Sequence, residues 1–264
     1  MRCLVLNQNK VKIFGVVPAR MGSSRFYGKP LHPICGRPMI EHVFERAKLF
    51  KHWDDLCLAT CDDEIADFAK TKQYPVMMTS NTHTRCLDRV AEAITKSPQI
   101  PTEHDIIVCV QGDEPMLHPD MIDAVIRPLQ EDISVNCTVL AMDICTEAQF
   151  LNPDTVKIIH NLKGDVLYTS RSPVPYCKSF SPELDAKRIY GIFAFRWHFL
   201  QKFNELPESP LELKESCDSN RIFDHGFKQR IAPYSYRASF SVDSPHDIAI
   251  VEAYMDSDSL AGTY

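Results

Sequence analysis

The stretch Ile13-Phe-Gly-Val-Val-Pro-Ala-Arg-Met-Gly-Ser-Ser-Arg-Phe-Tyr-Gly-Lys-Pro30 decides how the rest of the chain is interpreted. Residues 13–17 are apolar, rich in β-branched side chains and followed by a proline, which predicts a short buried strand. The loop that follows carries Arg20, Arg25 and Lys29 among glycines and serines. Backbone amides freed by glycine, together with cations, bind anions at a strand end. The stretch predicts a cradle for a nucleoside triphosphate, and a surface loop with scattered basic residues is the plainer alternative.

The composition is that of an ordinary globular protein, with 264 residues, 44% hydrophobic and 24% charged. This length accommodates one α/β domain with a sizeable core, or two small domains. The net charge of −6 argues against a nucleic-acid partner. There is no run of 18 apolar residues and no signal-peptide pattern, so we expect a cytoplasmic protein without a membrane partner. The ten cysteines include no Cys-x-x-Cys pair and are expected to be reduced thiols, mostly in the core.

The order of the predicted elements indicates an α/β fold. Strands are expected at 13–17, 56–60, 76–79 and 105–110, and helices at 39–50, after 64 and from about 90. This alternation predicts a parallel sheet with right-handed crossovers. Further strands are expected at 137–142, 157–160, 165–170 and just before Asp243, with a closing helix at 245–255.

We expect a short extension, 1–12, either an edge strand or a loose tail, and then a single domain over 13–264. Within it, 13–130 is expected to bind the nucleotide, 131–235 the acceptor and a second subunit, and 236–264 to hold a metal-binding strand and the last helix.

A second motif, Asp105-Ile-Ile-Val-Cys-Val-Gln-Gly-Asp-Glu-Pro115, places polar side chains after a buried strand. Ligands of open α/β sheets bind at the carboxyl ends of the strands, where Gln111, Asp113 and Glu114 are expected. A carboxylate beside a cationic loop suits a shared divalent metal, and Mg²⁺ prefers carboxylate, water and phosphate oxygens. A strand-end turn capped by an aspartate is the alternative.

Both motifs, with Gly36-Arg-Pro-Met-Ile40, resemble the CMP-Kdo synthetase family, which joins CMP from CTP to a 3-deoxy-2-ulosonic acid such as Kdo (3-deoxy-manno-octulosonate). Asn152-Pro-x-x-Val-Lys157, Leu167-Tyr-x-Ser-Arg-x-x-x-Pro175 and Val242-Asp-Ser-Pro245 also resemble that family, so the resemblance covers about 13–250. It implies a Rossmann-like nucleotidyltransferase fold, a mostly parallel mixed sheet flanked by helices with a small acceptor and dimerisation subregion. It also implies a cytidylyltransferase that acts as a homodimer.

The resemblance and the residues together give an expected site. The expected CTP contacts are Ala19, Arg20, Ser23, Ser24, Arg25, Lys29, Thr79, His83, Asp88, Arg89 and Gln111. The expected contacts with a small acidic sugar are Gln111, Lys157, Arg171, Arg188, Asp218 and Asn220. Asp113 and Asp243 are expected to hold Mg²⁺, and Arg20, Arg25, Lys29 and Asp113 to be catalytic.

The segment expected beside the base departs from the family pattern. A Ser-Gly-Thr is typical before the Asp-Arg pair, but this chain has Arg85-Cys-Leu87. The ending Leu87-Asp-Arg89 is instead similar to the spore-coat polysaccharide cytidylyltransferases. An ordinary helix start with an Asp88–Arg89 salt bridge is nearly as good an interpretation.

The expected sugar pocket departs as well. Ile189 and Phe193 stand where a His and a Tyr are typical, and Asp218 and Ser219 where a Glu-Gln pair is typical. A pocket that has lost polar contacts discriminates differently between sugars, so the acceptor need not be Kdo. Arg188 and Asn220 are candidate replacements.

Several alternatives stay open at this stage. The nucleotide could be UTP or GTP, the acceptor could be another nonulosonic acid, or the chain could be a nucleotide-binding regulator without catalysis. Lys157 alone could be a solvated strand end, Asp243 could cap the last helix, and the apolar run 189–195 fits a dimer surface or a central strand.

Overall fold

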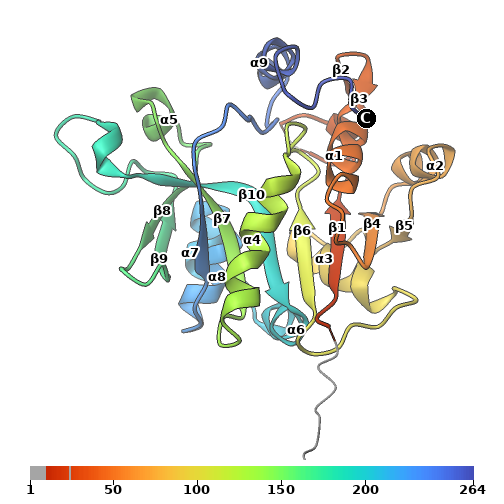
Figure 1. Cartoon of the computed structure of the whole chain (residues 1–264), viewed down its shortest axis with the longest axis horizontal. Helices are drawn as coiled ribbons and strands as arrows, with labels where there is room; N and C mark the ends of the chain where they lie inside the picture. The colour runs from red at the N-terminus through yellow and green to blue at the C-terminus, as the bar shows by residue number, and fades with distance from the viewer. Residues whose placement is uncertain (1–9, 24) are drawn as a thin grey trace, which may run out of the picture.

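A mixed β-sheet forms the centre of the molecule, which is described here by a computed structural model covering residues 10–23 and 25–264. Its strand order is β11-β7-β10-β6-β1-β4-β5, and β8 and β9 continue it as a hairpin beside β10 (Figure 1). The strands are β1 (Ile13–Pro18), β4 (Asp55–Thr60), β5 (Val76–Met78), β6 (Ile106–Val110), β7 (Cys137–Asp143), β8 (Lys157–His160), β9 (Val166–Ser170), β10 (Lys187–Arg196) and β11 (Arg230–Tyr234). A small separate hairpin joins β2 (Pro33–Ile34) to β3 (Arg37–Pro38).

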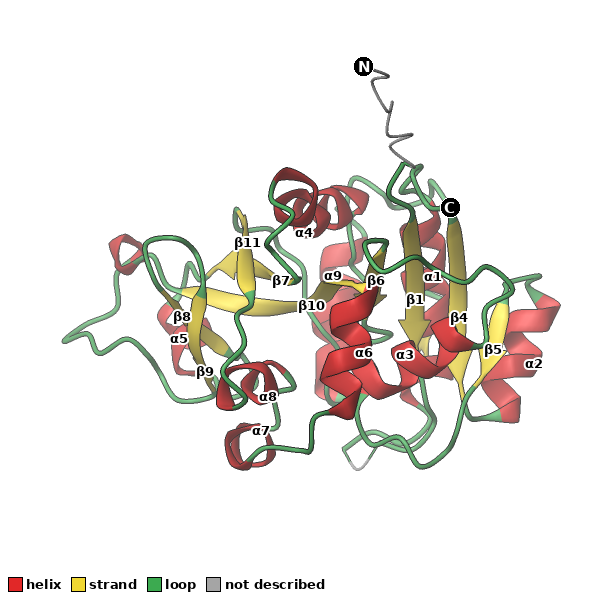
Figure 2. Ribbon diagram, turned by 90° about the horizontal axis from the view of Figure 1, so that it is seen from below, coloured by secondary structure: helices red, strands yellow, loops and turns green. Residues whose placement is uncertain are grey.

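Helices cover both faces of this sheet. They are α1 (Met39–Lys48), α2 (Asp63–Thr71), α3 (Cys86–Thr95), α4 (Pro119–Glu131), α5 (Glu147–Leu151), α6 (Trp197–Glu205), α7 (Pro210–Glu215), α8 (Ser219–Asp224) and α9 (His246–Met255). The apolar sides of α1, α2 and α4 pack against one face, and those of α3 and α6 against the other (Figure 2). Among the described residues, no helix is long and apolar enough to cross a membrane.

The strand directions confirm the predicted mostly parallel mixed sheet. Parallel pairs join β6 to β1, β1 to β4 and β4 to β5, whereas β10 runs antiparallel to both β6 and β7. The carboxyl ends of β1, β4 and β6 therefore lie at one edge of the sheet. The loops that leave these strands meet there.

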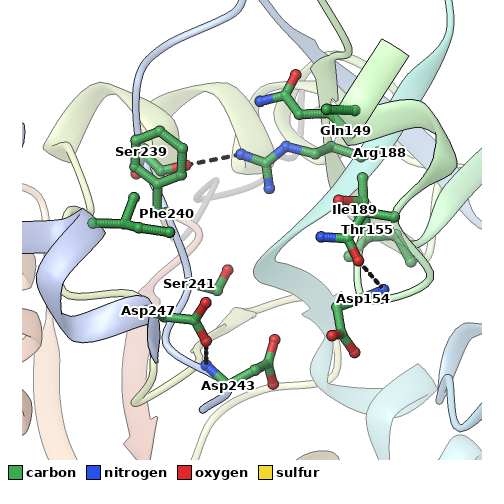
Figure 3. Close-up of a pocket in the computed structure, with 13 residues that line it drawn as sticks. Gln149, Asp154, Thr155, Arg188, Ile189, Ser239, Phe240, Ser241, Asp243 and Asp247 are labelled. Carbon is green, nitrogen blue, oxygen red and sulfur yellow. Dashed lines mark hydrogen bonds between the residues drawn. The ribbon is translucent and has the colours of Figure 1, made fainter. Parts of the chain in front are cut away.

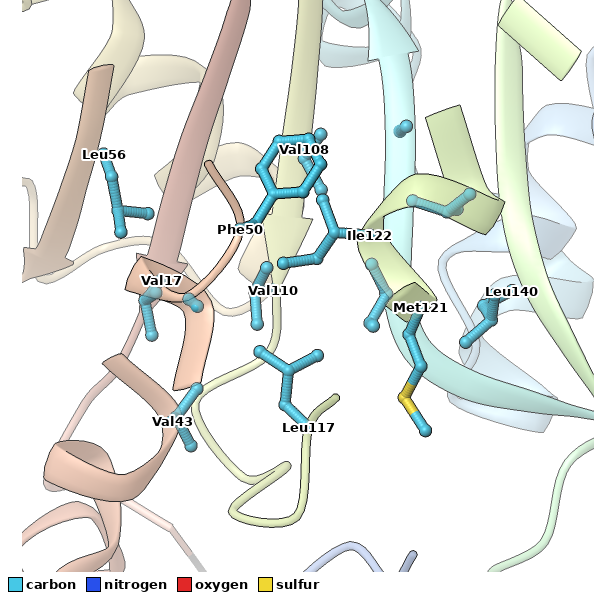
Figure 4. Close-up of a cluster of buried hydrophobic side chains, with 14 of the residues drawn as sticks. Val17, Val43, Phe50, Leu56, Val108, Val110, Leu117, Met121, Ile122 and Leu140 are labelled. Carbon is cyan, nitrogen blue, oxygen red and sulfur yellow. The ribbon is translucent and has the colours of Figure 1, made fainter. Parts of the chain in front are cut away.

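The core explains why the apolar runs become central strands. Val17, Val108, Val110 and Leu140 from three strands pack with Met121 of α4 and are fully buried (Figure 4). Each such side chain contributes roughly 1.5–3 kcal/mol on burial. The run 189–195 lies within β10, paired on both sides, so the central-strand interpretation is the correct one.

Two predicted elements differ from the structure. The helix expected from about residue 90 already begins at Cys86, directly after Arg85. The short strand expected before Asp243 does not form. The Val242 amide donates to the Asp113 carbonyl (2.9 Å), but the Val242 carbonyl accepts from Lys29 Nζ (2.6 Å). The Lys29 ammonium therefore occupies the Val242 carbonyl, which a neighbouring strand would need as its hydrogen-bond acceptor.

Candidate active site

The loop after β1 lines a cleft of about 590 Å³ at the shared edge of β1 and β6. Arg20, Ser23, Arg25 and Lys29 all face this cleft, while Ser24 lies outside the described residues. The loop turns at Gly28, whose φ of +74° is a left-handed conformation that favours glycine. Lys29 then begins the 3-10 turn η1 (Lys29–Leu31). The three predicted cations thus lie together on one wall of the cleft.

Aspartates from distant parts of the chain pair with these cations. Lys29 Nζ lies 3.0 Å from Asp113 Oδ2, at the end of β6. The Arg25 guanidinium contacts Asp243 Oδ1 at 2.6 Å and Asp154 Oδ1 at 2.9 Å. The cations and carboxylates neutralise one another across the cleft, so an entering polyanion would compete with the aspartates for the cations.

Asp113 and Asp243 are neighbours because the Val242 amide is hydrogen-bonded to the Asp113 carbonyl. Burial, and then the charge of Asp113, raise the pKa of Asp243 above its usual value. Within the described part of the chain, no group of three His, Cys, Asp or Glu side chains could hold a metal alone. Two adjacent carboxylates fit an Mg²⁺ ion that completes its shell with water and phosphate oxygens.

Asp243 does not cap the last helix, so that alternative is wrong. The Asp247 side chain, inside the first turn of α9, instead accepts from the amides of Asp243 (2.9 Å) and Ser244 (2.7 Å). These bonds fix the backbone at Asp243 and leave its carboxylate facing the cleft.

A second pocket of about 240 Å³ adjoins the first, and Ala19, Arg20, Arg85 and Ser216 line both. Its other walls come from the loop before α3, from Gln111 at the end of β6 and from the segment before α8. The sequence-predicted residues His83, Arg89, Gln111 and Asp218 line this second pocket, with Cys86 between Gln111 and Asp218.

The segment 79–89 is ordered by internal hydrogen bonds. Arg89 Nη1 donates to Thr79 Oγ1 (2.5 Å), while the buried Arg89 Nη2 has no partner among the described residues. His83 Nε2 is 2.5 Å from Glu92 Oε2. Asp88 contacts Arg221 (3.4 Å), so the expected Asp88–Arg89 salt bridge is wrong. The guanidinium of Arg89, a residue that lines the second pocket, suits the carbonyl or ring nitrogen of a base.

Close backbone contacts shape the floor between the two pockets. A Cβ on Gly112 would lie 2.6 Å from the Pro18 carbonyl, so glycine lets the ends of β1 and β6 approach. The Gly191 amide of β10 donates to Glu114 Oε1 (3.0 Å), which also accepts from Ser241 Oγ (2.7 Å). Burial, and then Asp113, raise the pKa of Glu114 to about 7.

Two predicted sugar contacts are unavailable. Lys157 is fully buried, and its ammonium donates to the carbonyls of Asn152 (2.9 Å), Thr155 (2.7 Å) and Arg171 (2.6 Å). Burial, and then the charge of Arg171, lower the pKa of Lys157 to about 8. Its ammonium joins three loop segments, so the predicted sugar contact and the solvated strand end are both wrong.

Asn220 is the second predicted sugar contact that is unavailable. It is fully buried and shares hydrogen bonds with Thr169, accepting from Oγ1 (2.9 Å) and donating to the carbonyl (3.2 Å). The predicted sugar contact at Asn220 is therefore wrong as well.

Arg171 and Arg188 face different cavities. Arg171 lines the cleft beside the loop after β1, where Arg171 Nη1 lies 3.5 Å from Asp154 Oδ1. Arg188 points from β10 into a separate cavity of about 280 Å³ and donates to the Ser239 carbonyl (3.0 Å; Figure 3). Both cavities share Asp243 and Asp154 as walls.

The lining residues that the sequence analysis missed include Asp154, Arg85 and Ser216. Asp154 pairs with Arg25, and Arg85 and Ser216 stand where the two pockets join. Asp154 lies inside the Asn152–Lys157 motif, which was a usable signal. Arg85 was noted only as a departure from a serine, and Ser216 carried no signal.

Comparisons with known proteins agree with this geometry. The model of the Cytidylyltransferase family matches residues 14–231. The 3-deoxy-manno-octulosonate cytidylyltransferases of Oleidesulfovibrio alaskensis and Nitratidesulfovibrio vulgaris are 39% and 40% identical, each over 90% of this chain and 94% of theirs. A solved structure of CMP:2-keto-3-deoxy-manno-octonic acid synthetase complexed with CTP superimposes with a TM-score of 0.82 at 34% identity, covering 93% of this chain and 99% of that one.

A cationic loop facing paired carboxylates, a second pocket beside it and similarity over nine-tenths of the chain lead to one assignment. The chain belongs to the cytidylyltransferase family.

Proposed function

We propose that this protein transfers CMP from CTP to Kdo and releases pyrophosphate in an Mg²⁺-dependent reaction. One observation carries the proposal: Lys29 and Arg25 face Asp113 and Asp243 across a single cleft. Relatives up to 40% identical that bear the Kdo-cytidylyltransferase name support Kdo as the acceptor.

The reaction joins the C2 hydroxyl oxygen of Kdo to the α-phosphorus of CTP. The bond from that phosphorus to the β-phosphate bridging oxygen breaks, pyrophosphate leaves, and the hydroxyl proton is lost. Such chemistry depends mainly on positioning and on neutralising charge. Arg20, Arg25 and Lys29 would bind the β- and γ-phosphates and stabilise the leaving pyrophosphate. Mg²⁺ held by Asp113 and Asp243 would supply charge neutralisation and lower the pKa of the attacking hydroxyl.

The ion pairs across the cleft indicate how CTP binding is coupled to the metal. Lys29 pairs with Asp113, and Arg25 pairs with Asp243. If a divalent cation binds both carboxylates, Lys29 and Arg25 become free to bind the phosphates. No charge is then left buried without a partner. CTP and metal are therefore expected to bind synergistically.

The remaining contacts follow from both pockets. Arg89, Ala19 and His83 would surround the base, with Thr79 positioning the Arg89 guanidinium. Gln111, Arg171 and Asp218 would contact the sugar acid, with Arg171 suited to its carboxylate. Ile189 and Phe193 pack into the core of the sheet and offer the sugar no polar atom.

The test is pyrophosphate release by the purified protein with Mg²⁺ and a full panel of partners. We expect turnover with CTP and Kdo, and much less with UTP, GTP or ATP. Turnover with another nonulosonic acid but not with Kdo would correct the acceptor. CTP binding without pyrophosphate release with any acid would instead identify the non-catalytic regulator.

We also propose that the protein acts in the cytoplasm as a homodimer formed through its second half. Leu162 and Leu167 of the β8–β9 hairpin and Tyr176 in the loop after it are highly exposed, at 109%, 58% and 90%. Exposed apolar side chains lose contact with water when a second subunit covers them, which favours association. Sedimentation velocity should show a dimer that Leu167→Glu weakens, and a monomeric wild type would overturn this part.

A further inference from the structure

We propose that Arg85 binds an oxyanion of the substrates at the junction of the two pockets. The inference rests on the proposed function, because it names what passes through that junction. Arg85 is the last residue of the loop before α3. It lines both the cleft beside the loop after β1 and the adjoining second pocket. A ligand that fills both pockets must pass this guanidinium.

The Arg85 side chain is held by charge and not by hydrogen bonds at Nε. This atom lies 3.7 Å from carboxylate oxygens of Glu208 and Glu212 and 3.8 Å from Asp218. All three distances exceed hydrogen-bonding range, and the buried Nε has no hydrogen-bond partner among the described residues. Nε therefore faces these carboxylates, while the terminal guanidinium nitrogens make no hydrogen bond among the described residues and are the atoms that a ligand in either pocket can reach.

Two of the three carboxylates have other partners. Both Glu212 oxygens accept from Arg221, at 2.6 and 2.8 Å, and one also accepts from the Ser209 amide at the start of α7. One Asp218 oxygen lies 3.5 Å from the Cys86 thiol. Arg221 is thus the arginine that hydrogen-bonds Glu212. Arg85 is positioned by the charge of the carboxylates, and its guanidinium keeps N–H donors that they do not use.

The chemistry of the junction indicates the ligand class. A second guanidinium, Arg20, lines the same two pockets, and its Nη1 donates to the His83 carbonyl at 3.3 Å. Two arginines at a junction recognise phosphate or carboxylate oxygens by charge-assisted hydrogen bonds. Two sources offer such oxygens here: the α-phosphate of a nucleotide whose base fills the second pocket, and the carboxylate of the acceptor.

Binding of each substrate to an Arg85→Gln variant distinguishes these sources. Calorimetry would measure CTP with Mg²⁺, and then Kdo added to the complex with α,β-methylene-CTP, which does not react. Losing a charge-assisted hydrogen bond should weaken one Kd by roughly 10- to 100-fold. A weaker Kd for CTP alone assigns Arg85 to the phosphate, and a weaker Kd for Kdo alone assigns it to the carboxylate.

Matched variants separate binding from folding. Arg85→Lys keeps the charge but not the fork, so it should recover only part of the lost affinity. Arg37→Gln, on β3 and outside both pockets, should change neither Kd. Wild-type Kd values for both ligands in a folded Arg85→Gln protein would overturn the proposal. If Arg85→Gln does not fold, unchanged Kd values in Arg85→Lys would do so.

The proposed function can fail independently of this inference. No turnover of CTP with Kdo by the wild-type protein would count against the function. The calorimetric comparison of Arg85 variants with CTP needs no turnover and would still decide the phosphate assignment.

Discussion

Lys29 and Asp113 form an ion pair of 3.0 Å between Nζ and Oδ2, although 84 residues separate them in the chain. Lys29 also donates to the Val242 carbonyl at 2.6 Å. One ammonium therefore joins the phosphate loop, the end of β6 and the segment that carries Asp243. Lys29, Arg25, Asp113 and Asp243, which are proposed to bind phosphate and metal, are thereby linked in one hydrogen-bonded unit.

Replacing Lys29 by methionine should lower kcat/KM for pyrophosphate release by roughly 10²–10³-fold, the cost of losing one preorganised donor to a developing charge. The matched control is Lys72→Met, because Lys72 pairs with Glu41 away from the cleft at 2.9 Å. Steady-state rates would measure both variants. Activity of Lys29→Met within threefold of the wild type would remove this lysine from the mechanism.

Asp113→Asn and Asp243→Asn should each abolish Mg²⁺-dependent turnover while the fold persists. Each removes a negative charge beside the expected phosphate position, so metal-free CTP should bind these variants at least as tightly as the wild type. Calorimetry with a chelator present, compared with Asp120→Asn on α4, would test this. Tighter metal-free binding by the wild type would contradict the assignment of the carboxylates.

Much of this unit could be predicted from the sequence. Residues 13–30 and 105–115 combine a buried apolar run with charged residues directly after it, and each motif is local. Parallel strands then bring the two motifs to one edge of the sheet. The fold followed from the same alternation of strands and helices.

What could not be predicted depends on contacts between distant segments. Lys157 reads as a polar strand residue, and only the positions of the Asn152, Thr155 and Arg171 carbonyls show that it is a buried tie. Likewise, Arg85 is a site residue because the start of α3 lies beside the segment before α8, a contact that the sequence does not reveal.

Lys157→Met should therefore destabilise the protein without weakening CTP binding. Three carbonyls would lose their donor, and each buried acceptor left unpaired costs about 1–3 kcal/mol. The free energy of unfolding in urea should fall by several kcal/mol, by this estimate. A stable variant with weakened CTP binding would instead make Lys157 a ligand contact, against the structure.

Gly112→Ala should destabilise the junction of β1 and β6. Its Cβ would lie 2.6 Å from the Pro18 carbonyl, and a backbone atom cannot move aside cheaply. Overpacking of this kind costs about 1–3 kcal/mol. Gly22→Ala is the control, because nothing lies within 4 Å of its Cβ position. Equal melting temperatures for the two variants would show that the contact is not tight.

His42 should make stability depend on pH. Its Nε2 donates to the Ile34 carbonyl (2.8 Å), which can only accept, so Nδ1 accepts from the Tyr264 hydroxyl (2.8 Å). Burial lowers the His42 pKa from the usual 6.5, and the nearby Arg46 and Arg37 add to the effect, against the opposing Ile34 hydrogen bond.

The unfolded chain therefore takes up this proton first as the pH falls. The stability that His42 contributes is present above pH 6.5 and is lost below it, as the pH drops through the lowered folded value. Urea unfolding at about pH 7.5 and about pH 5.5 should show a smaller difference for His42→Gln than for the wild type. Equal differences would exclude His42 as the source.

The central claim is that a Kdo hydroxyl displaces pyrophosphate from CTP in this cleft. Phosphorus NMR of a reaction containing the protein, CTP, Mg²⁺ and Kdo tests it most directly. We predict a phosphodiester resonance from CMP-Kdo that grows in equal molar amount with pyrophosphate. Neither product should form when Kdo is left out. Pyrophosphate released with CMP but without the phosphodiester, or no change in a protein that binds CTP, would contradict the account.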